Sequence, residues 1–144
     1  MKKILLAIGL FTTTFLSAQT SNKIVINSDN IIGMTTKINN LEVAEFDFPT
    51  KLNWNDSKIA CSKLGKGWRL PTVQELELIY NSNKKMKMNL NEGGTDVKFD
   101  DDYWSSELKS SKNSARNIMM RSGMTFFGFI TQKCNVRAVR SINN

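Results

Sequence analysis

The stretch of sequence that decides the fold is GWRLPTVQEL, residues 67–76. Thr72 and Glu75 stand three residues apart directly after Pro71. The threonine hydroxyl and the glutamate carboxylate can therefore each satisfy a backbone N–H at a helix start. This capping box predicts a helix that begins near Thr72 and runs to about Tyr80. The apolar side chains expected to face the core are those of Val73, Leu76 and Ile79.

An earlier helix is predicted from about Asn55 to Leu64. Small and apolar residues recur there at intervals of three and four, which is the spacing of one helix face. Cys61 falls on that inner stripe. Gly65 and Gly67 then supply the stop, because glycine readily adopts the backbone conformation that ends a helix.

Short strand-like segments flank the two helices. Residues 34–38 and 41–48 are predicted to form a hairpin around Asn39-Asn40, since Asn tolerates the positive φ of a two-residue turn. The polar residues 81–102 are expected to form a long loop. Further strands are expected at residues 103–106, 115–120, 125–130 and 136–142. This order predicts an α+β fold, in which two helices flank small antiparallel sheets beside a long loop region.

The first 18 residues are predicted to be a secretory signal peptide. Lys2 and Lys3 precede a mostly apolar run at 4–16, and small residues lead to a cleavage site after Ala18. The run is too short to span a bilayer comfortably, and no later run could anchor the chain. We therefore expect an exported protein, either secreted or located in the periplasm or at the cell surface. Its expected parts are an N-terminal arm or hairpin strand at 19–40 and one domain at 41–142.

Composition restricts the available chemistry. The chain has no His, which excludes Ser-His-Asp and Cys-His triads and His-based metal sites. Cys61 and Cys134 are too few for a four-thiolate zinc site. In an oxidising compartment they predict one disulfide, and the alternative is two buried thiols. The acidic run 100–102 with Glu107 lacks the interleaved spacing of a Ca²⁺ loop, so it predicts a solvated acidic turn. We expect no metal, no cofactor and no catalysis.

The order of several motifs along the chain is distinctive. Trp54 and Cys61 precede residues 67–72 and Glu75-Leu76, and then come Tyr103-Trp104-Ser105-Ser106 and Val136-Arg137-Ala138-Val139-Arg140. Over residues 41–142 this order resembles the Lcl C-terminal domain family and its relative, the Fibrobacter-succinogenes-type major paralogous domain. The resemblance implies a C-type-lectin-like fold, in which the N- and C-terminal strands pair and two helices flank them. The family's named member looks like an adhesin that recognises sulfated polysaccharide.

Two more specific functions are disfavoured by the same residues. The broad fold includes sulfatase-modifying enzymes, which act through a Cys-based copper site, but neither Cys61 nor Cys134 has a second Cys or a His near it in sequence. Trp54-Asn55-Asp56 spells a triplet found at calcium-dependent sugar sites. The companion Glu-Pro-Asn or Gln-Pro-Asp triplet is absent, so calcium-dependent lectin binding is not expected.

The candidate ligand-binding residues are cations and aromatics in the second half of the chain. Lys84, Lys85 and Lys87, with Arg121 in a later turn, are candidates for a patch that binds an acidic or sulfated polysaccharide, and the net charge of +7 suits such partners. A solvated charged loop is the alternative. Aromatic residues occupy both faces of strand 125–130. One set is expected in the core, and the other is expected to be either exposed for stacking or covered by the long loop. The candidates for stacking are Phe127 and Phe129.

A second group of residues is predicted to be structural: Trp54, Cys61, Trp68, Arg69, Pro71, Thr72, Glu75, Trp104, Ser105, Cys134 and Arg137. The expected function is that of a secreted, non-catalytic binding or adhesion module for a polysaccharide or a protein. It would act through residues 81–131, with no nucleic-acid partner and no membrane span. The alternative is a structural or assembly component of the cell envelope.

Overall fold

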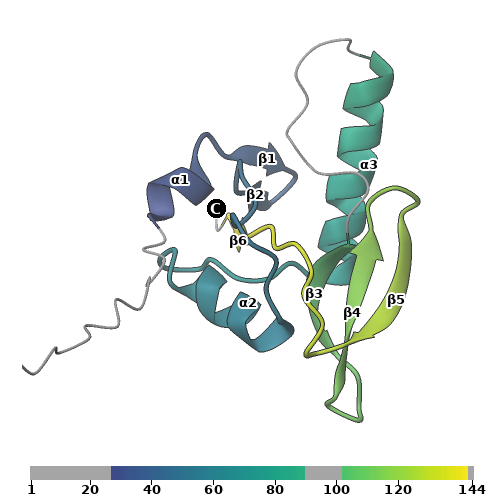
Figure 1. Ribbon diagram of the computed structural model, residues 1–144. Coiled ribbons are helices and arrows are strands. Elements are labelled where there is room, and N and C mark those ends of the chain that lie inside the picture. Colours follow the sequence, from purple (N-terminus) through teal and green to yellow (C-terminus); the bar gives the residue numbers. More distant parts are fainter. Residues whose placement is uncertain (1–26, 90–101, 143–144) are drawn as a thin grey trace, which may run out of the picture.

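The computed structural model of the protein describes residues 27–89 and 102–142 (Figure 1). The predicted signal peptide, residues 19–26 of the expected arm and residues 90–101 of the expected loop lie outside the described residues. In chain order the elements are α1 (Ser28–Ile32), β1 (Thr36–Ile38), β2 (Leu41–Val43), α2 (Trp54–Ser62), α3 (Val73–Asn89), β3 (Asp102–Leu108), β4 (Ser114–Met119), β5 (Met124–Phe129) and β6 (Val139–Ser141).

Two small antiparallel sheets organise these elements. The first has the order β1-β2-β6, so the last strand pairs with a strand from the start of the domain, with Leu41 opposite Ser141 and Val43 opposite Val139. The second sheet has the order β3-β4-β5, and α3 stands beside it and contacts β3 and β4 (Figure 1). This arrangement confirms the predicted α+β fold and the pairing of N- and C-terminal strands.

The capping box at the start of α3 is confirmed, but the predicted end of this helix is wrong. The Thr72 hydroxyl accepts from the Glu75 N–H at 3.2 Å, and the Glu75 carboxylate accepts from the Thr72 N–H at 2.7 Å. Instead of ending near Tyr80, the helix continues to Asn89. No Gly or Pro interrupts the sequence between Val73 and Asn89, and its Lys and Met residues are good helix formers. Residues 81–89 are therefore helix and not loop.

The N-terminal half of the domain also departs from the prediction. Residues 28–32, expected in an N-terminal arm or hairpin strand, form the short helix α1. Its N-cap Asn27 accepts from the Asp29 N–H, and its Ile31 is buried. The hairpin turn at Asn39 is confirmed, since this residue has a φ of 54°. The strands on either side of the turn are shorter than expected, because the ladder of β2 ends at Val43.

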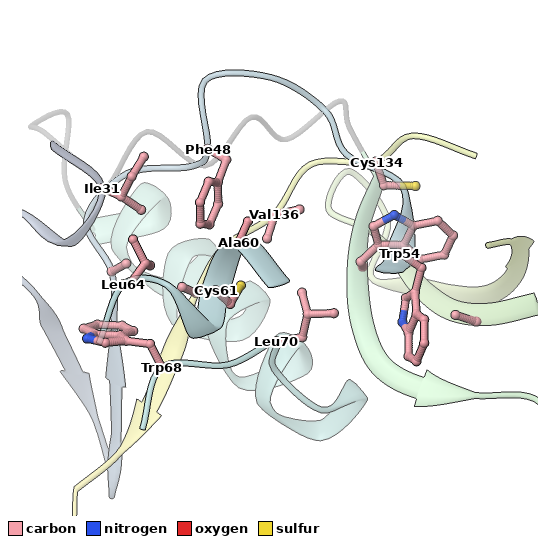
Figure 2. Packing of buried hydrophobic residues seen from close by; sticks show 14 residues of the cluster. Ile31, Phe48, Trp54, Ala60, Cys61, Leu64, Trp68, Leu70, Cys134 and Val136 are labelled. Atoms are coloured by element: carbon pink, nitrogen blue, oxygen red, sulfur yellow. The ribbon is translucent and has the colours of Figure 1, made fainter. Parts of the chain in front are cut away.

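The β3 strand divides the core into two apolar clusters. Alternate side chains of a strand point to opposite faces of its sheet, so neighbouring residues can belong to different clusters. Tyr103 packs with Leu76 and Ile79 of α3, whereas Trp104 belongs to a cluster that includes Trp54 of α2 (Figure 2). The two clusters together pack α2 and α3 against the sheets.

Two indole N–H groups bond the start of α2 to β3. Trp54 donates to the carbonyl of Ser105 at 2.8 Å, and Trp104 donates to the carbonyl of Leu52 at 2.9 Å. Both rings are buried, so an indole N–H without an acceptor would leave a costly unsatisfied donor. The reciprocal pair explains why two tryptophans 50 positions apart occur in this core.

The predicted disulfide between Cys61 and Cys134 is wrong. Both residues are buried thiols, and no bridge joins them. Figure 2 shows them apart in the core, with Cys61 on α2 and Cys134 on the other side of the cluster near Trp54. Cys134 pairs with Leu52 through backbone bonds of 3.0 and 3.1 Å, which place it beside the segment just before α2. The alternative interpretation, two buried thiols in the apolar core, is the one that holds.

A buried arginine joins the C-terminal segment to the first strands. Arg137 is 2% exposed, and its Nε donates to the Asp47 carboxylate at 2.7 Å. Its Nη1 donates to the carbonyls of Ala44 and Glu45, and the Tyr103 hydroxyl donates to the same Asp47 at 2.6 Å. A buried guanidinium requires such partners, because removing it from water is otherwise very unfavourable.

Candidate functional site

Two of the cations proposed from sequence, Lys84 and Arg121, lie at one end of α3. Lys84 is exposed on α3. For Lys85 and Lys87 the structure describes the helical backbone but not the side chains. Arg121 lies in the turn between β4 and β5, and this turn packs on α3. A Cβ at Gly123, where φ is 74°, would come within 2.7 Å of the ring of Tyr80. Tyr80 and Lys84 are four residues apart on α3 and therefore lie on the same side of the helix. The exposed Lys84 is thus near the β4–β5 turn, which contains Arg121.

Phe127 and Phe129 lie farther along β5 and are both on its exposed face. Their exposed fractions are 41% and 67%, whereas Phe126 on the other face is partly buried. The strand runs from Met124 to Phe129, roughly 17 Å at ~3.4 Å per residue. The cations at the turn and the two phenylalanines therefore do not form one compact site.

Two cations missed by the sequence analysis accompany Phe127. The guanidinium carbon of Arg116 lies 4.4 Å from the ring centroid, and the Nζ of Lys109 lies 5.4 Å from it. Both distances fall within the range of a cation–π interaction. We call Lys109, Arg116, Phe127 and Phe129 the aromatic face.

Sheet register brings Arg116 and Phe127 together. Arg116 of β4 is directly opposite Phe127 of β5, and Ser114 is opposite Phe129. Directly opposite residues point to the same side of a sheet, so the arginine covers the phenylalanine. Periodicity alone could not give this pairing, because it requires the exact length of the turn at 120–123. If a four-residue turn at 120–123 is assumed, the sequence predicts that Arg116 lies opposite Phe127.

Polar contacts position the arginine of the aromatic face. Its Nη1 donates to the Thr125 hydroxyl at 3.4 Å, and its Nε is 3.5 Å from the Glu107 carboxylate. Glu107 also accepts from the backbone N–H of Val73 at 3.1 Å, at the start of α3. An exposed ion pair of this length contributes little stability. It does fix the direction of Arg116, which remains partly open to solvent.

An open groove beside α3 is a weaker candidate for a site. It has a volume of about 410 Å³ and is lined by residues that include Asn40, Leu78 and Glu75. The Glu75 carboxylate is already occupied, because both Nη atoms of Arg69 donate to it at 2.7 Å. Burial alone would raise the pKa of Glu75, but these hydrogen bonds and the one from Thr72 outweigh burial and lower it. The carboxylate acts as a cap and ion-pair partner.

The remaining residues predicted as structural make local contacts of the fold. Arg69 exchanges two backbone hydrogen bonds with Val139, at 2.9 and 3.0 Å. The carbonyl of Pro71 accepts from the Ser106 N–H at 2.7 Å. The hydroxyl of Ser105 donates to the carbonyl of Arg116 at 2.8 Å. The segment around residues 69–71 thus ties the first sheet to the second.

The buried thiol of Cys61 is poorly suited to nucleophilic chemistry. Burial raises its pKa to about 12, so the thiolate is scarce near neutral pH. In the part of the chain that the structure describes, no three His, Cys, Asp or Glu residues group as metal ligands. Within those same residues, no helix is long and apolar enough to cross a bilayer.

The structure defines a C-type-lectin-like α+β domain. It has paired N- and C-terminal strands, the two longer helices α2 and α3, and a second three-stranded sheet. Solved structures similar to it include convulxin, a snake venom toxin, with a TM-score of 0.54 and 10% identity over 76% of this chain and 96% of that chain. Botrocetin has a TM-score of 0.52 and 11% identity over 74% of this chain and 95% of that chain. EMS16, an antagonist of the collagen receptor integrin α2β1, has a TM-score of 0.50 and 12% identity over 74% of this chain and 96% of that chain. At such identities the likeness shows the fold alone.

The chain belongs to the Lcl C-terminal domain family, whose model matches residues 19–140. This match confirms the resemblance seen in the motif order and extends it toward the N-terminus. A comparison with curated proteins found no match.

Proposed function

We propose that this protein is an exported, non-catalytic binding module that recognises a protein or polysaccharide ligand through the aromatic face. The observation that carries the proposal is the exposed ring of Phe127 with Arg116 and Lys109 within cation–π distance of it, and with Phe129 on the same face of β5. Exposed aromatic rings next to cations can stack on a sugar or apolar group and attract an anionic one.

Two further observations support binding over catalysis. The only cysteine in a helix, Cys61, is buried with a raised thiol pKa, which disfavours an enzyme of the sulfatase-modifying kind. The structurally similar EMS16 is an antagonist of a collagen receptor, and botrocetin has been solved in complex with a von Willebrand factor A1 domain. These proteins show that folds of this kind serve as binding modules, with protein partners in both cases.

A binding screen of the purified protein tests the proposal. Sulfated and neutral polysaccharides and proteins of the cell exterior would be presented at low and physiological salt. We expect a ligand whose binding falls at least about tenfold in the Phe127→Ala, Phe129→Ala double variant.

The matched control is Ile59→Ala, which removes an apolar side chain that is 52% exposed on α2 and is not a member of the aromatic face. It should bind like the unaltered protein. If the double variant binds a ligand as tightly as the unaltered protein does, the binding site for that ligand is not the aromatic face. No binding to any probe would favour a role in envelope assembly.

A further inference from the structure

The β5 strand is the outer strand of the second sheet. The sheet order is β3-β4-β5, so one long edge of β5 pairs with β4 and the other does not pair with any described strand. Residues 124–129 read MTFFGF, without the Lys, Pro or charged residues that commonly protect an edge strand. Met124, Phe127 and Phe129 are 68%, 41% and 67% exposed, so the side chains beside this edge are open to solvent within the described structure.

The register shows which backbone groups point outward from this edge. The N–H of Ile130 donates to the carbonyl of Asn113 at 3.0 Å, which makes these two residues a hydrogen-bonded pair. Hydrogen-bonded and non-hydrogen-bonded pairs alternate along an antiparallel ladder. Counting back along β5, the residues that do not bond to β4 are Thr125, Phe127 and Phe129.

These three residues present a row of donors and acceptors. The carbonyl of Phe129 accepts from the Gln132 N–H at 2.8 Å. Among residues 27–89 and 102–142, no other backbone bond is made by the outward groups. Three N–H groups and the carbonyls of Thr125 and Phe127 thus remain available, at the ~6.8 Å spacing of alternate strand residues. An extended peptide matches this spacing, whereas a polysaccharide has no backbone amides to match it.

The two faces beside this edge differ in character. Thr125, Phe127 and Phe129 share a face with Arg116 and Lys109. The opposite face carries Met124 and Phe126 next to the edge. The described cations around the aromatic face outnumber its one carboxylate, Glu107. A bound strand would therefore place acidic side chains on the aromatic face and apolar ones on the other.

We propose that β5 binds an extended acidic segment of a partner protein as an antiparallel fourth strand of the sheet. This inference rests on the proposed function and names its ligand class. A second copy of this chain is a poorer occupant of the edge. Two β5 edges in contact would bring two sets of Arg116 and Lys109 together, in a chain that already carries a net positive charge.

Synthetic peptides test the proposal on the intact, exported protein. The probe is an eight-residue peptide of alternating Glu and Val with blocked ends, and a Lys-Val peptide of the same length is the charge control. In an antiparallel addition, the residues that bond to β5 share the face of Phe127, so they are the Glu residues. N-methylation of the Glu amides should weaken binding at least about tenfold, and N-methylation of the Val amides should leave it within about twofold.

Two variants of the protein probe the same bonds from the other side. Thr125→Pro removes an outward N–H that β4 does not use, a substitution that edge strands tolerate. Thr125→Ala removes the same hydroxyl and keeps the N–H. We expect the proline variant to lose at least about tenfold in peptide affinity and the alanine variant to retain it. Amide spectra of both variants check that the sheet is intact, and the N-methylated peptides give the answer with unaltered protein.

The remaining outcomes overturn the inference. Equal binding of the two N-methylated peptides, tighter binding of the Lys-Val peptide or no binding of the Glu-Val peptide would each do so. If heparin binds the aromatic face and the Glu-Val peptide does not, the strand addition is wrong and the proposed function stands. If neither these probes nor proteins of the cell exterior bind, both proposals fail together.

Discussion

Arg116 on β4 covers the ring of Phe127 directly opposite on β5, with 4.4 Å between the guanidinium carbon and the ring centroid. This contact lies on a solvent-exposed surface, where it cannot be explained by the need to fill a core. It pre-orders a cation and an aromatic ring side by side, so that less side-chain entropy is lost when a ligand binds.

The coupling between these two residues should be measurable as stability. A double-mutant cycle with Arg116→Met and Phe127→Leu is expected to give a coupling free energy of about 0.5–1 kcal/mol, the size of an exposed cation–π contact. Urea denaturation of the four proteins measures it. Additive effects of the two changes would show that the stacking is incidental.

The buried arginine should be far more important to stability than an exposed one nearby. Arg137→Met leaves the carboxylate of Asp47 without its ion-pair partner, and we expect a loss of about 3–5 kcal/mol in the free energy of unfolding. Arg140→Met is the matched control, because Arg140 pairs with Glu42 at 2.6 Å but its side chain is 40% exposed. The control should lose no more than about 1 kcal/mol. Similar losses in the two variants would contradict this assignment.

The Glu75 carboxylate should contribute to the pH dependence of stability. Its pKa in the folded state is below the ordinary value of 4.5, because the hydrogen bonds from Arg69 and Thr72 outweigh the effect of burial. Its stabilising contribution is therefore complete above pH 4.5 and is lost as the pH falls through the lower folded-state value.

Replacing Glu75 tests this dependence directly. Glu75→Gln should reduce stability at pH 7 and flatten the decline in stability below pH 4.5, measured as thermal midpoints across pH. Glu77→Gln, at an exposed position of the same helix, is the control and should change neither. An unchanged acid limb in Glu75→Gln would disprove the role of this carboxylate.

The cysteines should behave as two buried thiols. With the thiol pKa of Cys61 raised to about 12, alkylation of the folded protein at pH 8 should be very slow. After unfolding without reductant, mass spectrometry should find two labels per chain, one each at Cys61 and Cys134. If labelling requires a reductant, the two residues are bridged after all.

Local chemistry made the elements around residues 67–76 predictable from sequence. The bonds of Thr72 with Glu75 depend only on residues three apart, and the core tryptophans follow from motif order. The end of α3 was not predictable in this way. The mostly polar sequence beyond Tyr80 shows no apolar stripe that would indicate a helix, although it contains no helix-breaking residue.

The aromatic face was only half predictable for a related reason. Aromatic alternation marked Phe127 and Phe129, but their partners come from elsewhere in the chain: Arg116 from β4 and Lys109 from the residue after β3. The position of Arg116 depends on the register of β4 with β5, which the length of the turn at 120–123 sets and composition does not. The disulfide prediction failed on the same point, since cysteine count and compartment say nothing about whether Cys61 and Cys134 meet in the core.

An NMR titration of the exported protein tests the central claim, that the aromatic face is the ligand-binding surface. Heparin and the Glu-Val peptide would be added separately, and backbone amide shifts followed. We predict that the largest shifts fall on Arg116, Thr125, Phe127 and Phe129 with at least one of the two ligands. The largest shifts at the groove around Leu78 and Glu75, or no shifts with either ligand, would contradict the claim.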